Sequence, residues 1–352
     1  MTGFNTRSIH SGRPDRSPDG PFNTPISLNS TYYAGGDIGY ARYGNENCKD
    51  LENAISSLEG GKTLAFSSGM SAVSSILSTI PVGGIVVASN QGYAGVNATL
   101  KKLNDENKII ARFVDIANTE EVIENLTGAY MLWIESPTNP MLDIAELETL
   151  INCAKQSNII VVVDNTFATP INQQPLKLGA DISLHSVTKY LSGHSDVLIG
   201  SISTNNNDLF EKIEFERKIN GTIAAPFESW LSLRGIRTFP LRFKKSENNA
   251  RGLVWRLQNH PKVNKVYYPG FGGVVSFEID ATEIEVDEIC YSSKLIGYAT
   301  SLGSVESLWE RRRRWPLESP LVPHNLIRLS VGCEDMEDIW NDIKYSIEKV
   351  VG

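Results

Sequence analysis

Short apolar runs alternate with segments of helical periodicity between residues 61 and 203, and this alternation restricts the fold more than any other feature of the sequence. The runs are apolar on both faces and rich in β-branched residues, as is typical of strands covered on both sides. They span Thr63–Phe66, Ile85–Ala88, Ile109–Val114, Met131–Glu135, Ile159–Asp164, Ile182–His185 and Val197–Ser201. Strand, helix and strand repeated in this order predict right-handed crossovers and a largely parallel sheet in an α/β fold. Ligands of such sheets bind beyond the carboxyl ends of the strands.

Two of the intervening segments carry specific helix signals. The apolar residues of 147–154 recur at i, i+3, i+4 and i+7, which predicts a helix with one buried face. A second helix is predicted to begin at Asn118, with Glu121 three residues later as its capping-box partner.

The two ends of the chain differ from this central pattern. Residues 1–50 are rich in Gly, Pro, Ser and Asn and lack a sustained period, which predicts an extended arm that needs a surface to lie on. We expect an α/β domain over residues 51–235 and a smaller α+β domain over residues 236–352. Beyond residue 205, helices are expected at 210–218, at 227–260 with an interruption at Pro240, and at 336–350, and strands at 263–268, 274–279 and 326–331.

Length, charge and cysteine content narrow the class of protein. A chain of 352 residues suggests two domains at about 150 residues each. With 33 basic and 41 acidic residues the net charge is −8, which argues against binding nucleic acid through bulk phosphate attraction. The four cysteines lack C-x-x-C spacing and predict neither a metal site nor a disulfide framework. Neither a secretory signal nor an apolar run of ~18 residues is visible, so we expect a cytoplasmic protein without membrane contact.

A lysine and an aspartate stand at or just beyond the carboxyl ends of two of the predicted strands. Lys189 follows the run that ends at His185, and Asp164 ends the apolar run 159–163. A lone lysine in a polar turn is usually solvated, but a buried aspartate is costly unless it meets a cation. A protonated pyridine nitrogen is such a cation. An amine, a carboxylate and nearby hydroxyl groups are what pyridoxal phosphate requires, so the pattern favours this cofactor.

A third strand end carries groups suited to a phosphate. The segment Ser67-Ser68-Gly69-Met70 lies between the run that ends at Phe66 and a predicted helix. The glycine lets the backbone approach a ligand, and N–H groups at a helix N-terminus attract a dianion.

Two rival motifs fail on their spacing. The stretch Gly60-Gly61-Lys62-Thr63 suggests a nucleotide-binding P-loop, but the first glycine of that motif would fall at Ser56, and the stretch precedes its strand. The stretch Gly193-His194-Ser195-Asp196-Val197 lacks the closing glycine of a hydrolase nucleophile elbow.

A series of motifs in a fixed order spans nearly the whole chain. They are Tyr40-Ala-Arg-Tyr-Gly-Asn45, Ser68-Gly-Met70, Glu135-Ser-Pro-Thr-Asn-Pro140, Val163-Asp-Asn-Thr-Phe-Ala-Thr-Pro170, His185-Ser-Val-Thr-Lys-Tyr190, Gly193-His-Ser-Asp196, Ser301-Leu-Gly303 and Arg328-Leu-Ser-Val-Gly332. In this order the chain resembles the trans-sulfuration enzymes, the Cys/Met-metabolism pyridoxal-phosphate family of cystathionine γ-synthase, the cystathionine lyases and methionine γ-lyase. The resemblance implies an aspartate-aminotransferase-like fold (PLP fold type I) and a homotetramer built from dimers that share active sites.

The resemblance also implies roles for the residues that match these motifs. Lys189 would be the Schiff-base lysine and proton shuttle, and Asp164 would keep the cofactor ring nitrogen protonated. Tyr93 would stack on the ring and assist proton transfer, and Asn139 would lie near the cofactor phenolate oxygen. The phosphate would be bound by Ser68, Gly69, Met70, Ser186 and Thr188, joined by Tyr40 and Arg42 from the neighbouring subunit. Arg328 and Ser301 would bind the substrate α-carboxylate, to which the planar fork of arginine is suited.

The chain departs from the family pattern around the distal end of the substrate. Many relatives that handle cystathionine carry arginine where this chain has Ala98, and glutamate where it has Thr300. The run Arg311–Arg314 replaces a His-Pro-Ala type of segment. A solvated charged face is the simplest interpretation of this run. As a hypothesis, one of its arginines replaces the missing distal positive charge.

The sequence therefore predicts an enzyme of sulfur amino-acid metabolism that uses pyridoxal phosphate and acts at the γ-carbon of a homoserine ester or of cystathionine, by replacement or elimination. Cystathionine β-lyase and methionine γ-lyase activities remain open, since both would use the same core residues. The alternative of another class is a catalytically silent regulatory or scaffold relative.

Overall fold

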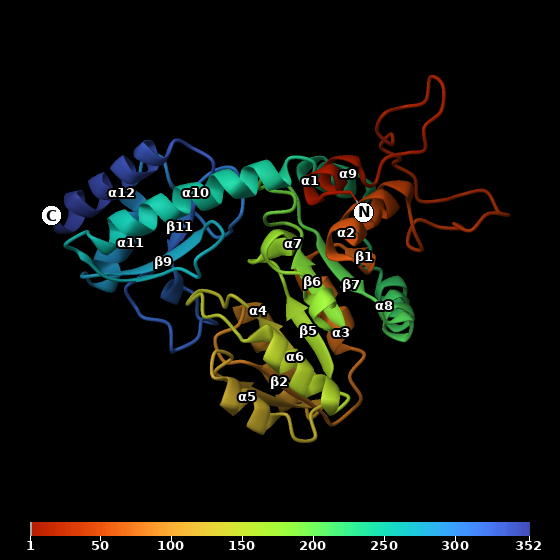
Figure 1. The fold of residues 1–352 in the computed structure, drawn as a ribbon, viewed down its shortest axis with the longest axis horizontal. Helices are drawn as coiled ribbons and strands as arrows, with labels where there is room; N and C mark the ends of the chain where they lie inside the picture. The colour runs from red at the N-terminus through yellow and green to blue at the C-terminus, as the bar shows by residue number, and fades with distance from the viewer. Residues whose placement is uncertain (1) are drawn as a thin grey trace.

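The computed structural model describes residues 2–352, and its larger sheet has seven strands. They are β1 (Lys62–Phe66), β2 (Gly84–Ser89), β3 (Ile109–Val114), β4 (Met131–Glu135), β5 (Ile160–Asp164), β6 (Ile182–Ser186) and β7 (Gly200–Thr204). Their order is β1-β7-β6-β5-β4-β2-β3, in which β7 runs antiparallel to both neighbours and the other pairs are parallel. The expected α/β fold with a mostly parallel sheet is confirmed (Figure 1).

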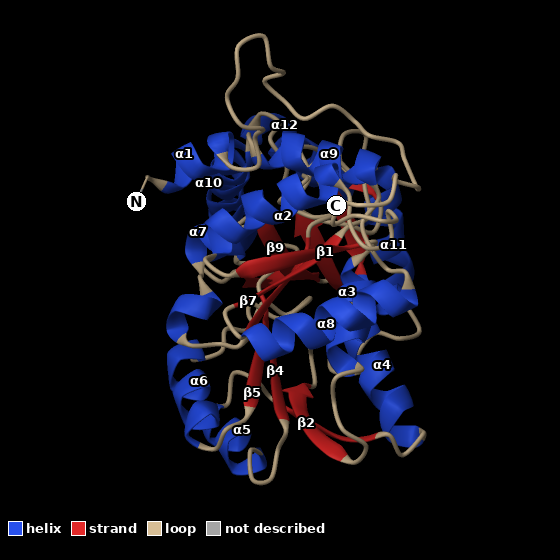
Figure 2. Ribbon diagram, turned by 90° about the vertical axis from the view of Figure 1, so that its right-hand side faces the viewer, coloured by secondary structure: helices blue, strands red, loops and turns tan. Residues whose placement is uncertain are grey.

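Helices cover both faces of this sheet (Figure 2). On one face α3 (Gly69–Leu77), α4 (Ala94–Asp105) and α8 (Asn207–Asn220) pack in a buried apolar cluster, and on the other α5 (Thr119–Asn125) and α6 (Leu147–Gln156) pack in a second one. Val86 and Val87, neighbours on β2, lie in these two different clusters because successive strand residues face opposite ways. This two-sided burial explains why the predicted strands are apolar throughout.

Both helices predicted from specific signals are confirmed, but the capping box predicted for the second is not. Leu147, Leu150, Ile151 and Ala154 form the buried face of α6. Asn118 caps α5 by accepting a hydrogen bond from Glu121 N at 3.2 Å. The expected capping box is wrong, because the Glu121 carboxylate accepts from Asp115 N instead.

The seventh strand was predicted at Val197–Ser201, and it lies three residues later, at Gly200–Thr204. The preceding residues are held elsewhere, since both backbone groups of Ile199 bond the Thr188 hydroxyl. The strand begins at a glycine because β7 passes very close to the turn before α3: a Cβ on Gly200 would lie 2.3 Å from Ser68 O.

The second sheet has five strands in the order β10-β11-β12-β9-β8. They are β8 (Val263–Tyr267), β9 (Val274–Ile279), β10 (Gly297–Tyr298), β11 (Leu308–Arg311) and β12 (Leu326–Ser330), and α10 (Phe239–Gln258), α11 (Glu283–Ser292) and α12 (Met336–Val351) pack on them around one apolar cluster. Sequence reasoning missed β10, β11 and α11, because β10 is two residues long and β11 carries Glu310 and Arg311. The expected domain boundary near residue 236 stays a prediction.

The helix break expected at Pro240 lies earlier. Helix α9 (Pro226–Ile236) ends at Ile236, and Pro240 is the second residue of α10. Proline is tolerated there because the first helical N–H groups have no intrahelical acceptor.

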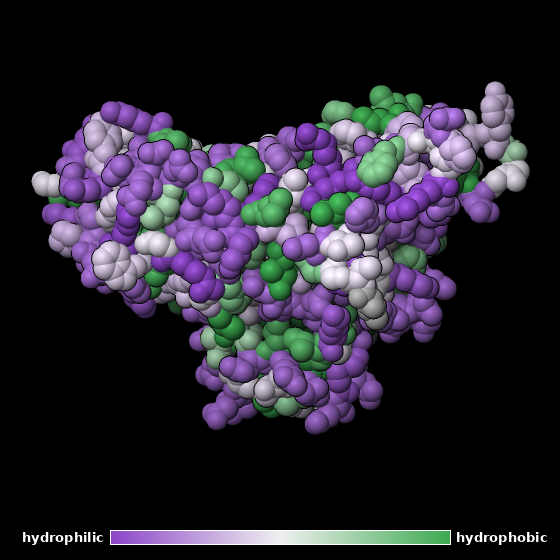
Figure 3. Space-filling view, turned by 45° about the horizontal axis from the view of Figure 1, so that its top comes forward, coloured by the Kyte–Doolittle hydropathy of each residue, from purple (hydrophilic) through white to green (hydrophobic). Residues whose placement is uncertain are grey.

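The N-terminal arm, residues 1–50, contains one short helix and, from Glu46 onward, the first residues of a second helix, neither of which the sequence predicted. Helix α1 (Phe4–His10) packs through Phe4 against Phe239 at 6.3 Å between ring centroids, near α2 (Glu46–Glu59). The rest of the arm is irregular and stands off the body (Figures 1 and 3), with Phe22, Leu28 and Tyr33 exposed. Among residues 2–352, no helix has the length and apolar character required to cross a membrane.

Candidate active site

The carboxyl ends of three neighbouring strands bring charged side chains to one edge of the large sheet. Glu135 ends β4, Asp164 ends β5 directly opposite it in the register, and Lys189 lies in the turn after β6. A cavity opens at this edge, as expected for a parallel sheet. The sequence-predicted residues that line it are Ser68, Gly69, Met70, Tyr93, Asn139, Asp164, Ser186, Thr188, Lys189, Ser301 and Arg328.

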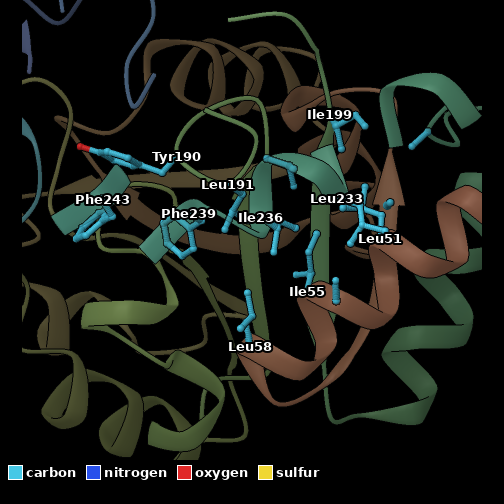
Figure 4. Packing of buried hydrophobic residues seen from close by; sticks show 14 of the residues in the cluster. Leu51, Ile55, Leu58, Tyr190, Leu191, Ile199, Leu233, Ile236, Phe239 and Phe243 are labelled. Carbon is cyan, nitrogen blue, oxygen red and sulfur yellow. The ribbon is translucent and has the colours of Figure 1, made fainter. Parts of the chain in front are cut away.

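Lys189 is held by the apolar core beneath it. Its neighbours Tyr190 and Leu191 are buried in the cluster of α2, α9 and α10 (Figure 4). Arg242 donates to the carbonyl oxygens of both, at 3.0 and 3.3 Å. Lys189 Nζ donates to Ser301 Oγ at 3.0 Å. Burial, reinforced by the positive charge of Arg328, lowers the pKa of Lys189 to about 8.

Asp164 presents one bonded and one unbonded carboxylate oxygen. Oδ1 accepts from Thr166 N at 3.0 Å and from Thr166 Oγ1 at 2.6 Å, whereas Oδ2 receives no hydrogen bond from residues 2–352. Burial raises the pKa of Asp164, which means that its charge lacks compensation. A cationic N–H donor in the cavity would supply that compensation.

Glu135 is a site residue that sequence reasoning did not single out. It is buried beside Asp164, and it accepts a hydrogen bond from Tyr93 N, at the start of α4. Burial, and then the neighbouring Asp164, raise the pKa of Glu135 well above its ordinary value. The only sequence signal was its place at the end of a strand, within a motif already noted.

The start of α3 forms a cradle of backbone N–H groups. Ser68 caps the helix by accepting from Ser71 N at 3.0 Å, and the N–H groups of Gly69 and Met70 donate to no group within residues 2–352. A Cβ on Gly69 would lie 3.2 Å from Ser186 Cβ, so glycine permits this close approach. Free N–H groups at a helix N-terminus suit a phosphate.

Thr188, Tyr40 and Arg42 were also predicted to bind the phosphate, but their contacts in this chain do not point to that role. The Thr188 hydroxyl donates to Ile199 O at 3.2 Å. Tyr40 and Arg42 do not line the cavity of their own chain, and Arg42 Nη1 donates to Lys218 O at 2.8 Å. The roles predicted for these three residues stay predictions.

Arg328, on β12, reaches the cavity from the second sheet. It is 3% exposed and donates from Nη1 to Asn139 Oδ1 at 2.8 Å and from Nη2 to Ser301 O at 3.1 Å and Glu310 Oε1 at 2.8 Å. Its Nε is buried without a partner among residues 2–352. Burial, and then the charge of Arg312, lower the pKa of Arg328 to about 10. A carboxylate ligand would satisfy this buried cation.

The solvated face expected for Arg311–Arg314 is wrong for its first two members. Arg311 and Arg312 are 7% and 4% exposed, whereas the next two arginines are partly exposed. Arg311 pairs with Asp287 at 2.8 Å, and Arg312 pairs with Glu310 at 2.7 Å and lines the cavity. Buried arginines are accommodated when carboxylates and hydrogen bonds accompany them. The acidic residues that flank the run in sequence were the available signal.

The donor set of the cavity fits pyridoxal phosphate. It offers an amine of lowered pKa, a carboxylate oxygen without a partner and a cradle of free N–H groups. Lys189 and Asp164 would hold the cofactor ring, and Ser68, Gly69, Met70 and Ser186 its phosphate. The unpartnered Nε of Arg328 would remain for a carboxylate of the substrate.

Comparisons with known proteins agree with this fit. The model of the family described as "Cys/Met metabolism PLP-dependent enzyme" matches residues 5–348. Cystathionine γ-lyase of Bacillus subtilis is 38% identical, over 98% of this chain and 99% of its own. Cystathionine β-lyase of Lactococcus lactis is 36% identical, over 99% of this chain and 100% of its own. The crystal structure of cystathionine γ-synthase from Xanthomonas oryzae, in complex with aminoacrylate and cysteine, superposes with a TM-score of 0.95 at 29% identity, over 99% of each chain.

Proposed function

Since the chain belongs to the Cys/Met metabolism family of enzymes that depend on pyridoxal phosphate, we propose that it replaces or eliminates the substituent on the γ-carbon of a homoserine ester or of cystathionine. It is an enzyme that uses pyridoxal phosphate and acts on amino acids. Bound pyridoxal phosphate supplies the electron sink that allows an amino acid to lose protons from Cα and Cβ.

This proposal rests on one observation: Lys189 and Arg328 both form hydrogen bonds with Ser301. Lys189 Nζ bonds the Ser301 hydroxyl and Arg328 Nη2 bonds the Ser301 carbonyl, at 3.0 and 3.1 Å. A substrate α-carboxylate on Arg328 therefore places Cα beside the lysine amine. An amine with a pKa of about 8 can both accept and return a proton near neutral pH. Lys189 thus moves the protons of Cα and Cβ that γ-chemistry requires.

Three other residues prepare the site for this proton transfer. Asp164 would keep the ring nitrogen of bound cofactor protonated, and its Oδ2, which the hydrogen bonds from Thr166 leave unused, is available for this. Tyr93 would stack on the cofactor ring and assist proton transfer, and the hydrogen bond from its N–H to Glu135 fixes its backbone. Asn139 accepts a hydrogen bond from Arg328 at 2.8 Å, which holds the arginine in place, and would lie near the phenolate oxygen of bound cofactor.

The assembly extends the proposal to a neighbouring copy of the chain. We place a PLP-binding α/β domain at residues 51–235, a C-terminal domain at 236–352 and the arm at 1–50 against the neighbour, in a cytoplasmic homotetramer. Support comes from Tyr40 and Arg42, which lie outside the cavity of their own chain, and from the exposed apolar side chains of the arm.

Product analysis tests the proposed reaction. Purified holoenzyme is incubated with cystathionine, with homoserine esters plus cysteine, and with methionine. We expect cysteine, 2-oxobutyrate and ammonia from cystathionine and water, or cystathionine and the free acid from an ester and cysteine. Pyruvate with homocysteine would instead identify a β-lyase, and methanethiol with 2-oxobutyrate a methionine γ-lyase. No product from any substrate would point to a silent relative.

Cofactor attachment should depend on pH through Lys189. Only a neutral amine attacks an aldehyde, and burial lowers the pKa of this lysine to about 8. At that pKa about a tenth of the amine is neutral at pH 7 and about nine-tenths at pH 9. We expect the rate of covalent attachment of pyridoxal phosphate to cofactor-free protein, followed by absorbance, to rise about tenfold from pH 7 to pH 9 and then level off.

An Arg328→Gln variant provides the control for this pH profile. Arg328 contributes to the lowered pKa of Lys189, so its loss should move the midpoint to higher pH. A rate that keeps rising above pH 10 in the unmodified protein would mean that the lysine has an ordinary pKa, and would contradict the burial argument.

A further inference from the structure

The inner wall of the cavity carries a second arginine beside Arg328. Arg312 begins the short 3₁₀ helix η2 (Arg312–Arg314) after β11 and lines the same cavity as Lys189, Thr300 and Arg328. Arg312 and Arg328 both donate to Glu310 Oε1, at 2.7 and 2.8 Å, so their guanidinium groups are neighbours.

Arg312 is fixed rigidly and stays charged. Glu310 accepts from its Nη1, and Glu318 Oε2 accepts from both its Nε and its Nη2. The two carboxylates raise the pKa of Arg312 despite its burial. Preorganisation of this kind lowers the entropy cost of binding a ligand.

These hydrogen bonds leave two N–H groups of the Arg312 guanidinium available to a ligand. Of its five N–H groups, three donate to Glu310 and Glu318, and one on each terminal nitrogen has no acceptor among residues 2–352. Because Nε and Nη2 bond the same oxygen of Glu318, the spare Nη2 hydrogen is the one that faces Nη1, at the outer end of the guanidinium. A carboxylate accepts hydrogen bonds from this end.

We propose that Arg312 binds a second carboxylate, carried on the γ-substituent of the substrate, while Arg328 binds the α-carboxylate. The preferred substrates are then amino acids with a distal acid group, such as cystathionine or a homoserine ester of a dicarboxylic acid. Thr300 lines the same cavity without adding negative charge, and its hydroxyl donates to Glu310 Oε2 at 2.8 Å. The inference rests on the proposed function and names the substrate class of that site.

A matched pair of unreactive ligands tests this assignment by binding alone. L-2-Aminopimelate and L-2-aminoheptanoate differ only in the distal carboxylate, and calorimetry on the holoenzyme gives their Kd ratio. We expect aminopimelate to bind about 10- to 100-fold more tightly, and this preference to disappear in Arg312→Gln. The double variant Arg312→Gln, Glu318→Gln should behave in the same way without leaving Glu318 unpaired. Arg313→Gln is the control, since within residues 2–352 the Arg313 side chain bonds only the carbonyl oxygens of Pro320 and Val322.

The kinetic counterpart compares O-succinylhomoserine with O-acetylhomoserine. Arg312→Gln should lower kcat/KM for the succinyl ester about 10- to 100-fold more than for the acetyl ester. An unchanged binding ratio in both Arg312 variants, or an equal loss for both ligands, would overturn the proposal. A binding preference that depends on Arg312 in a protein without γ-activity would uphold the assignment and refute the proposed function instead.

Discussion

Lys189→Ala is expected to lower kcat by at least about 10³-fold for every substrate, because a positioned acid–base group alone contributes about 10²- to 10⁴-fold and, in our proposal, this lysine also attaches the cofactor. Its amine bonds the hydroxyl of Ser301, the residue whose carbonyl oxygen bonds Arg328, for which we propose carboxylate binding. Cofactor should remain only non-covalently bound and should leave on dialysis. Borohydride reduction followed by mass spectrometry measures the attachment directly, and steady-state assays measure kcat.

Lys212→Ala is the matched control for this variant, since Lys212 is exposed on α8 and makes no contact with the cavity. It should retain a reducible covalent link and ordinary turnover. If a reduced adduct persists in Lys189→Ala, the cofactor is attached to another residue and the assignment of this lysine is wrong.

The cofactor end of the site was predictable because its signals are local. Asp164 is the last residue of one apolar strand and Lys189 lies three residues after the end of the next, and the carboxyl ends of parallel strands meet at one edge of the sheet. The pattern of the chain between residues 61 and 203 thus supplied both the sheet and the position of these side chains.

The substrate end was less predictable because it depends on contacts between distant segments. Arg328 meets Asn139 across 189 positions in sequence, and the resemblance alone supplied its role. Arg312 looked solvated because its partners Glu310 and Glu318 could not be placed inside the protein from a run of charges. The strand β11 was missed for the same reason, since its charged side chains are buried in ion pairs with residues of other elements. A run of charged residues usually indicates a solvated surface, but in this segment charged side chains are buried because they are paired with charges of opposite sign in the interior.

Asp164→Asn is the second variant with a large expected effect. Asparagine keeps an Oδ1 that can accept both hydrogen bonds from Thr166, so the side chain should stay in place. Its other terminus becomes an N–H donor where the carboxylate would face the protonated ring nitrogen. The ring nitrogen then loses its proton and the cofactor becomes a weaker electron sink. We expect kcat to fall by about 10²- to 10³-fold, the range found when one preorganised electrostatic partner is removed.

The cause of this fall can be separated from a general loss of structure. Asp181→Asn is the control, because Asp181 precedes β6 at the opposite edge of the sheet and accepts from Val161 N at 2.8 Å and from Lys155 at 2.6 Å. Its loss should lower the free energy of unfolding without lowering kcat by more than a few fold. Asp164→Asn should do the reverse, with nearly unchanged thermal unfolding and a shifted absorbance maximum of the bound cofactor. An Asp164→Asn enzyme with normal kcat would show that the buried carboxylate serves the fold rather than the ring nitrogen.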